Sequence, residues 1–461
     1  MRHRYIGDKA FYRRVLAVAL PIIVQNGITN FVSLLDNIMV GQVGTLQMSS
    51  VAIVNQLLFV FNLCIFGAVS GAGIFSAQFF GSENHEGVRY TFRFKLIIGL
   101  LLSLAGILIF CLADRTLIGL YLQGEGTAAD IAATLAHGQD YLTIMLFGLP
   151  AFALSTAYSS TLREGNRAIV PMVAGITAVV INLCLNYVLI FGHLGAPIMG
   201  IRGAALATVI ARYSELAIVA GWTHYHRSKN LFIQGVYRSI HIPGRLLKQI
   251  ILKGMPLLLN EALWSTGMAM LSQSYSTRGL DVVAAQNISS TLYNLSSVVF
   301  LSMGNAVGII MGQMLGANKT EAEVRDYNRK LMVTSVLSCV IFGGLMAAIS
   351  GLFPRIYKTT DEIRHLATQL ILVSAVLMPF NAYTNACYFT LRSGGKTMIT
   401  FLFDSCYVWT ACVPLAFILS RFTGLPILPL YSICHSMDIL KCIVGAYMVR
   451  QGKWIQNLAS Q

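Results

Sequence analysis

Long apolar stretches fill this chain and constrain its fold more than any other feature. Of its 461 residues, 56% are hydrophobic and only 11% are charged, about half the charge of an average soluble domain. A helix needs about 20 apolar residues to cross a bilayer, and twelve stretches are long enough. They lie near residues 15–40, 49–79, 96–113, 134–162, 169–192, 202–224, 247–275, 284–315, 331–353, 366–391, 398–420 and 426–449. Because such stretches are too long for the strands of a membrane barrel, the sequence predicts an all-α polytopic membrane protein.

The second half of the sequence repeats motifs of the first half about 235 residues later. GAGIFSAQFFG at 71–81 is matched by NAVGIIMGQMLG at 305–316, and Pro21 in the first stretch by Pro256 in the seventh. Repeats of this kind are typical of secondary transporters, which hold their substrate between the repeats. We therefore expect two pseudo-symmetric six-helix lobes and a cytoplasmic connector, at residues 1–224, 248–461 and 225–247.

Basic residues are concentrated in alternate connections between the stretches. They follow the second, fourth, eighth and tenth stretches and fill the connector, whereas the opposite connections carry few. Under the positive-inside rule this distribution predicts that both termini lie in the cytoplasm. We expect the chain to be a multi-pass protein of the plasma (inner) membrane. Topology thus explains the net charge of +14, so we expect the lipid bilayer, not nucleic acid, as the partner of a monomeric chain.

Ionisable residues at membrane depth are costly unless they are paired or hydrated, so each marks a candidate functional site. Arg212 and Glu215 lie three residues apart in the sixth stretch, and Asp438 and Lys441 lie three apart in the twelfth. Residues at this spacing share a helix face. We expect each pair to neutralise itself and to clamp its own lobe.

Three acidic residues, Asp36, Glu261 and Asp404, have no basic partner nearby in the sequence. An isolated carboxyl in dry surroundings can take up a proton and release it, or exchange it for Na⁺ or a cationic substrate. Asn182 and Asn186 share one face of the fifth stretch, and their amide oxygens beside Asp36 would suit Na⁺ at Asp36 and Asn182, or a relayed proton. The alternatives are a permanently protonated carboxyl and asparagines that only join helices.

These residues resemble those of the multidrug and toxic compound extrusion (MATE) family over nearly the whole chain. The similar motifs are LLDNIMVGQVG around Asp36, NLCLN around Asn182 and Asn186, LREGNR, LRSGGK, MGIRGAALAT and the carboxyl-terminal GKWIQN. The resemblance implies antiport in which cargo leaves as H⁺ or Na⁺ enters, with no other cofactor. It assigns Asp36 as the coupling carboxylate, with Asn182 and Asn186 beside it.

Other candidate residues follow from the same resemblance. Glu261 matches an acidic residue that some members use to bind a cation, but where those members add an aspartate this chain offers Asn381. In some members Asn186 is also replaced by an aspartate, so the proton relay is weakened here. Thr208 in the sixth stretch is expected to approach the first-lobe site.

The predicted function is export of small cationic or amphipathic organic compounds by alternating access. The alternative is a flippase or exporter of lipid-linked oligosaccharide or another amphipathic metabolite, which would line its cavity with several basic residues for phosphate. Here Arg212 and Lys441 are the basic residues deep in the stretches, and both have acidic neighbours. Catalytic motifs such as HExxH and GxSxG are missing from the sequence, so an enzyme is not expected.

Overall fold

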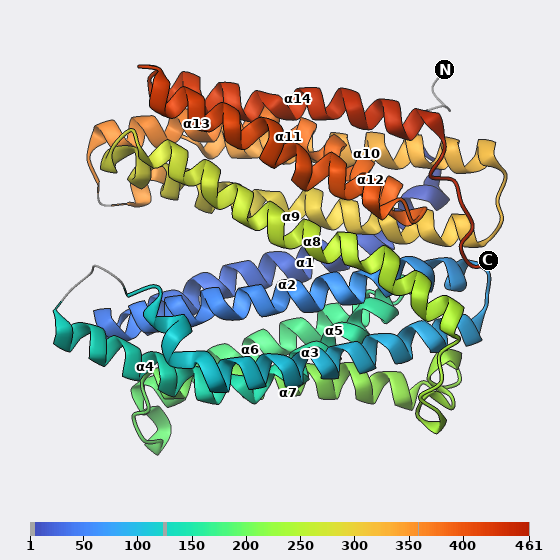
Figure 1. The fold of residues 1–461 in the computed structure, drawn as a ribbon, viewed down its shortest axis with the longest axis horizontal. Helices are drawn as coiled ribbons and strands as arrows, with labels where there is room; N and C mark the ends of the chain where they lie inside the picture. The colour runs from blue at the N-terminus through green and yellow to red at the C-terminus, as the bar shows by residue number, and fades with distance from the viewer. Residues whose placement is uncertain (1–4, 123–126, 358, 461) are drawn as a thin grey trace. The chain divides into compact units, whose positions relative to one another are not determined.

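The computed structural model describes residues 5–122, 127–357 and 359–460, and long helices dominate this part of the chain (Figure 1). The first half contains α1 (Lys9–Gly41), α2 (Thr45–Gly81), α3 (His85–Gly119), α4 (Ala128–Leu146), α5 (Gly148–Glu164), α6 (Ile169–Phe191) and α7 (Ile201–Tyr225). The second half contains α8 (Gly244–Ser276), α9 (Leu280–Gly316), α10 (Glu321–Ile349), α11 (Asp361–Ser393), α12 (Thr397–Phe401), α13 (Val413–Phe422) and α14 (Ile427–Gln451). Two π-helical segments, Leu402–Cys406 and Val408–Cys412, continue the helix from α12 to α13. Short 3-10 turns lie at His193–Gly195, Leu231–Ile233, Val236–Arg238 and Phe353–Ile356.

Eleven of the twelve predicted stretches coincide with one helix or one continuous helical run, and the fourth, at 134–162, spans the two helices α4 and α5. Ten described helices are long and apolar enough to cross a membrane, and eleven are if α4 and α5, which meet at 45°, form a single span. Among the described helices, α8 falls below that test because Asn260 and Glu261 interrupt its apolar sequence, although it has 33 residues. The prediction of an all-α polytopic membrane protein is confirmed.

The lengths of the leading helices repeat between the two halves. Both α1 and α8 have 33 residues and an internal proline, and both α2 and α9 have 37 residues. The repeated QxxG motif explains one close approach: a Cβ on Gly81 would overlap the carbonyl of Gln313, and one on Gly316 would overlap the carbonyl of Gln78. Only glycine, which lacks a Cβ, lets backbones come so near.

Contacts between Cα atoms divide the chain into two compact units. Unit 1 comprises the described part of Met1–Ile23, together with Ala77–Glu83 and Met255–Gln461. Unit 2 comprises Val24–Ser76 and Asn84–Gly254. The start of α1 and the end of α2 therefore pack with the second half of the chain. The predicted lobes at 1–224 and 248–461, joined by a connector at 225–247, remain a prediction.

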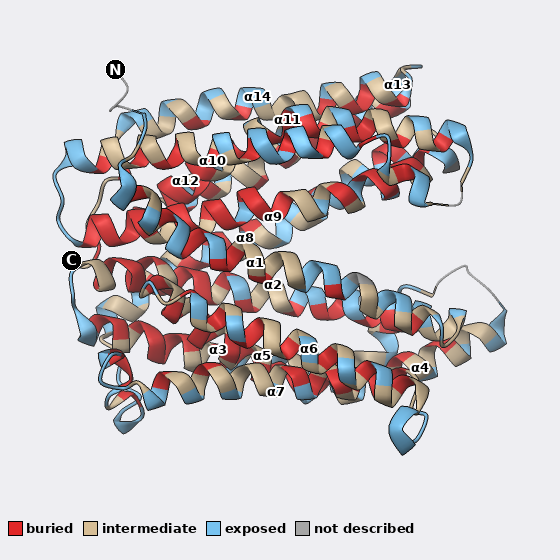
Figure 2. Cartoon of the chain, turned by 180° about the vertical axis from the view of Figure 1, so that it is seen from behind, coloured by how far each residue is buried: buried red, intermediate tan, exposed pale blue. Residues whose placement is uncertain are grey.

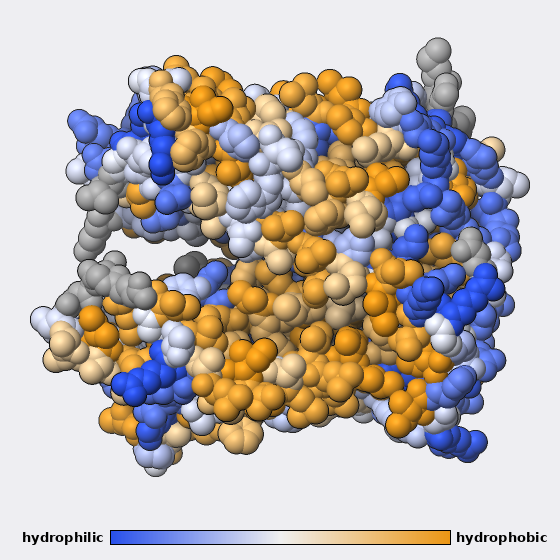
Figure 3. Space-filling model, in the orientation of Figure 1, coloured by the Kyte–Doolittle hydropathy of each residue, from blue (hydrophilic) through white to orange (hydrophobic). Residues whose placement is uncertain are grey.

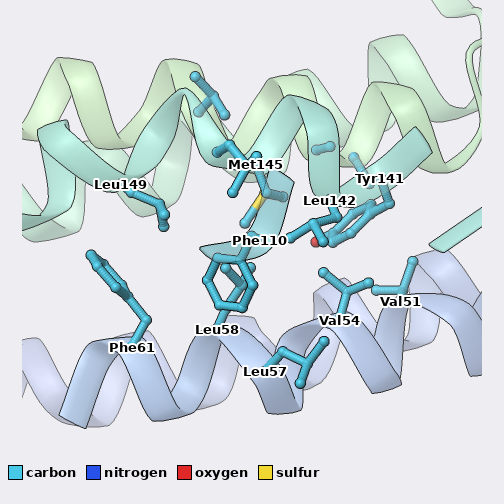
Figure 4. Close-up of a cluster of buried hydrophobic side chains, with 14 of the residues drawn as sticks. Val51, Val54, Leu57, Leu58, Phe61, Phe110, Tyr141, Leu142, Met145 and Leu149 are labelled. Atoms are coloured by element: carbon cyan, nitrogen blue, oxygen red, sulfur yellow. The ribbon is translucent and has the colours of Figure 1, made fainter. Parts of the chain in front are cut away.

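Each unit has a buried apolar core. In unit 2, side chains of α2, α3, α4 and α5 interdigitate, including Val54, Leu58, Phe110 and Met145 (Figure 4). Figure 2 shows such buried residues along the faces where neighbouring helices of a unit meet. Hydrophilic residues gather at the helix ends, and apolar residues cover most of the length between them (Figure 3), as expected of a surface that faces lipid.

Candidate functional site

Asp36 on α1 is surrounded by polar side chains from α6 and α7 within unit 2. Nδ2 of Asn186 donates a hydrogen bond to Oδ1 of Asp36 at 2.8 Å. The side-chain amide of Asn182 lies between Asp36 and Thr208. Its oxygen or nitrogen, whichever end faces Asp36, is 3.0 Å from both carboxylate oxygens, and the opposite end is 3.2 Å from Oγ1 of Thr208. The structure thus brings the four residues together, while their part in coupling remains a prediction.

The sequence positions these groups through simple helix geometry. Asn182 and Asn186 are four residues apart, so both amides leave α6 on the same side. Both side chains are buried, and Thr208 reaches them from the neighbouring α7. The hydroxyl of Thr208 also donates to the carbonyl of Ala204 one turn earlier, at 3.0 Å.

The Asn182 amide can present either end to Asp36. With its NH₂ toward Asp36, it donates to the carboxylate, and its oxygen accepts from Thr208. With its oxygen toward a protonated Asp36, its NH₂ donates to Oγ1 of Thr208, whose hydroxyl donates to Ala204. Either arrangement gives each end of the Asn182 amide a partner, so this amide can support both charge states of the acid.

Neutral donors, rather than cations, hold Asp36. Among the described residues, the ion pairs closer than 4.0 Å do not include Asp36. Oδ1 of Asn186 is buried without a hydrogen-bond partner, which leaves an acceptor beside the carboxylate. A carboxylate with spare amide and hydroxyl oxygens suits a hard cation such as Na⁺ or a proton.

Arg212 and Glu215 do not form a close ion pair, although their charges still interact as the sequence predicts. In the described part of the chain these residues form no ion pair within 4.0 Å. The guanidinium of Arg212 instead lies 5.1 Å from the centre of the Phe152 ring, and Nη1 is buried without a hydrogen-bond partner. The long arginine side chain extends toward the junction of α4 and α5, where Gly148 leaves room for it.

A buried ion pair between α3 and α5 escaped the sequence analysis. Nζ of Lys95 lies 2.6 Å from Oε2 of Glu164, and these side chains are 0% and 7% exposed. The ammonium also donates to the hydroxyls of Ser160 and Thr161, each at 3.1 Å. From the sequence alone, Lys95 counts as one of the basic residues of a cytoplasmic connection, and this pair was therefore missed. The feature that could have indicated it is Glu164, the acidic residue of the LREGNR motif.

In unit 1 the structure corrects two further predictions, concerning Asp404 and Lys441. Asp404 is not isolated: Nζ of Lys441 on α14 lies 2.5 Å from its Oδ1, and Nδ2 of Asn260 donates to its Oδ2 at 3.0 Å. The ammonium of Lys441 therefore pairs with Asp404 rather than with Asp438. The physical reason is tertiary packing, because α14 lies against the π-helical segment that carries Asp404. Segments of this kind are frequent at functional sites.

Glu261 and Asn381 lie on α8 and α11 of the same unit. Among the described residues, the ion pairs within 4.0 Å do not include Glu261. Asn381 donates to the hydroxyl of Tyr293 on α9 at 3.2 Å, and Asn260, the residue before Glu261, bonds to Asp404. Glu261 thus forms no close ion pair, although the charge of Arg392 acts on it, whereas the amide of Asn381 bonds to a tyrosine.

Known proteins resemble this chain along almost its whole length. The MatE family model matches residues 21–188 and 256–419. The probable multidrug resistance protein NorM of Thermotoga maritima is 23% identical over 444 residues, covering 96% of this chain and 93% of that protein. The multidrug resistance protein NorM of Vibrio cholerae is 26% identical, covering 93% and 91%.

Solved structures share the fold at low sequence identity. An outward-facing multidrug resistance MATE family transporter of the MOP superfamily superimposes with a TM-score of 0.86 at 17% identity, covering 98% of both chains. A MOP superfamily transporter from Pyrococcus furiosus, described as having a binding pocket of reverse polarity that suggests a different function, gives a TM-score of 0.83 at 18% identity, again covering 98% of both chains.

Proposed function

Because the chain belongs to the MATE family of multidrug efflux transporters, we propose that it is a secondary antiporter that exports small cationic or amphipathic organic compounds in exchange for H⁺ or Na⁺. It is a multi-pass membrane protein. The proposal places it in the plasma membrane with both termini in the cytoplasm, following its basic connections. The observation that carries the proposal is Asp36, a carboxylate held by neutral amides.

Antiport requires that cargo and coupling ion each lower the affinity of the protein for the other. A carboxylate can meet this requirement, since a bound proton or Na⁺ removes the negative charge that attracts a cationic cargo. Asp36 is suited to this exchange because Asn182 can hold the ionised acid with its NH₂ or the protonated acid with its oxygen. The charge can therefore change while the Asn182 amide keeps a partner at each end.

Na⁺ is the second candidate for the coupling ion. The oxygens available to it are those of Asp36, the unpartnered Oδ1 of Asn186, and the amide oxygen of Asn182 when that amide turns its oxygen toward Asp36. Hard oxygen ligands of this kind suit Na⁺ as well as a proton. The donor set is compatible with either ion, so the choice between them falls to the transport assay below.

An exporter of a phosphate-bearing lipid-linked sugar is the second candidate function. It is favoured by Arg212, whose guanidinium forms no ion pair within 4.0 Å among the described residues and has Nη1 buried without a hydrogen-bond partner, although the charge of Glu215 still acts on it. Against it, the buried ammonium groups of Lys95 and Lys441 are both neutralised by carboxylates. The anionic group at Asp36 then favours a cationic cargo.

The test is gradient-driven transport of a fluorescent organic cation by the purified chain in liposomes. We expect transport under an imposed pH gradient or an imposed Na⁺ gradient, and its loss in Asp36→Asn. Asp140→Asn is the matched control, because Asp140 is an exposed partner of Arg202 in the same unit. Equal gradient-driven transport by Asp36→Asn and the native chain would contradict the assigned role.

A further inference from the structure

A cavity of about 420 Å³ lies within unit 1, where α10 begins and α14 ends. Basic side chains line one part of it: Arg325 and Arg329 on α10, and Arg450 on α14. Apolar side chains, among them Val336 and Leu337, line another part. In the described part of the chain no carboxylate lines the cavity, so it is unsuited to the cationic cargo proposed above.

The arginines differ in how many of their donors are already used. Arg325 is occupied, since Nη2 lies 2.7 Å from Oε1 of Glu321 and Nη1 donates to the carbonyl of Arg450 at 2.8 Å. Arg329 lies 3.8 Å from Asp326, a carboxylate that Lys330 already holds at 2.6 Å.

Arg450 is exposed. Among the described residues its guanidinium makes no ion pair within 4.0 Å. Its neighbour Arg329 makes a long contact to a shared carboxylate and lies over the ring of Tyr5, with 5.9 Å between its guanidinium carbon and the ring centre. The guanidinium groups of Arg329 and Arg450 therefore have N–H donors available to a ligand. The forked arrangement of these donors matches the oxygens of a phosphate group.

The apolar part of the cavity runs along α10 and away from the arginines. Eight residues separate Arg329 from Leu337, a rise of about 12 Å along a helix. Leu337, Ile341 and Tyr447 are 54%, 63% and 65% exposed. The apolar part of the cavity is thus continuous with the apolar surface of α10 and α14, which a membrane protein turns toward lipid.

We propose that this cavity binds one anionic glycerophospholipid, with its phosphate on Arg329 and Arg450 and one acyl chain along Val336 and Leu337. Basic pockets between membrane helices on the cytoplasmic side recognise such head groups. We place the bound lipid in the inner leaflet of the membrane, and this placement rests on the proposed orientation of the chain. The binding of the lipid does not rest on the proposed antiport. A soluble anion would use the arginines alone and leave the apolar part unused.

The bound lipid would hold together three elements at this end of the unit. Trp454, in the segment after α14, lines the cavity and is buried, with Nε1 donating to the carbonyl of Val449 at 3.0 Å. That segment is tied to the end of α2, because the backbone N–H of Leu458 donates to Oε1 of Gln78 at 2.6 Å. Lipid binding should therefore raise the thermal stability of the folded protein.

The experiment is thermal unfolding of the full chain in detergent, with added phosphatidylglycerol, phosphatidylcholine of the same acyl chains, or inorganic phosphate. We expect saturable protection by phosphatidylglycerol and little by the other two. Arg329→Ala and Arg450→Ala should each weaken the apparent affinity about tenfold, the loss expected for one charged hydrogen bond. Arg238→Ala, at an exposed arginine of the connector, is the matched control and should bind as the native chain does.

A second variant tests the apolar half of the cavity without changing its charge. Ala446→Phe places a ring in the cavity, which Ala446 lines, and should remove protection by phosphatidylglycerol while the protein stays folded. Native mass spectrometry should count one retained phosphatidylglycerol on the native chain and none on this variant. Equal protection by phosphatidylcholine, equal protection by phosphate alone, or full protection of a variant lacking both Arg329 and Arg450 would overturn the proposal.

Discussion

Replacing Glu164 by glutamine would test whether the buried ion pair of unit 2 stabilises the fold. The exchange keeps the size of the side chain, which matters because Oε1 of Glu164 lies against Gly73 of α2, where even a methyl group would be crowded. It removes the negative charge and leaves the ammonium of Lys95, whose side chain is 0% exposed, with only hydroxyl and amide oxygens. The perturbation is therefore electrostatic and not steric.

The expected cost follows from the burial of the pair. Removing one partner of a buried ion pair destabilises a protein by about 3–5 kcal/mol, because the other charge stays behind without compensation. The remaining amide oxygen still accepts from Lys95, so we expect the lower end of that range, about 3 kcal/mol. Replacing both Lys95 and Glu164 by methionine removes both charges and should cost about 1 kcal/mol or less.

The measurement is the free energy of unfolding from denaturant titration in mixed micelles, for the native chain, Glu164→Gln and the double methionine variant. Asp140→Asn is the matched control, since its pair with Arg202 has a similar 2.8 Å separation but side chains 44% and 58% exposed. An exposed pair contributes about 0–1 kcal/mol. If Glu164→Gln cost no more than Asp140→Asn, the reasoning from burial would be refuted.

The remaining predictions concern three other places in the molecule. Lys441→Met should sharply lower the yield of folded protein, because it leaves Asp404 unpaired. Adding Asp404→Asn to this variant should restore both folding and gradient-driven transport. A double variant that folds but does not transport would instead make Asp404 part of the coupling site. Gly81→Ala should lower the unfolding temperature by several degrees because its methyl group meets a backbone carbonyl, whereas Gly344→Ala, where no atom lies within 4 Å, should be tolerated; equal unfolding temperatures would argue against the close approach. Thr208→Val should slow transport about tenfold by leaving a buried amide unsatisfied, and Thr208→Ser should restore it; equally slow transport by the serine variant would show that the hydroxyl is not the cause.

The helices could be predicted from the sequence because the bilayer dictates them. Backbone groups in lipid must bond within their own segment, so a long apolar stretch folds as helix. Every predicted stretch does so, and the fourth forms two helices. The break between α4 and α5, at Phe147, and the π-helical segments near Asp404 lay beyond that reasoning. They alter the winding inside a stretch without changing its apolar character.

The polar partners were predicted less completely, for a physical reason. Asn182 and Asn186 share a face through the period of one helix, so their common direction follows from spacing alone. The partners of Arg212, Lys95 and Lys441 lie on other helices, and tertiary packing selects them. A spacing of three residues shows which groups share a face of one helix, but a long basic side chain reaches equally well across to a neighbouring helix.

The most direct test of the account is the number of ions released when cargo binds to the protein. Calorimetry of cation binding in buffers of different ionisation enthalpy measures protons, and the same titration at varied Na⁺ concentration measures Na⁺ release by linkage. We predict that the native chain releases about one H⁺ or Na⁺ per bound cargo, and that Asp36→Asn releases none. Release of the same number of ions by Asp36→Asn would contradict the claim that Asp36 exchanges coupling ion for cargo.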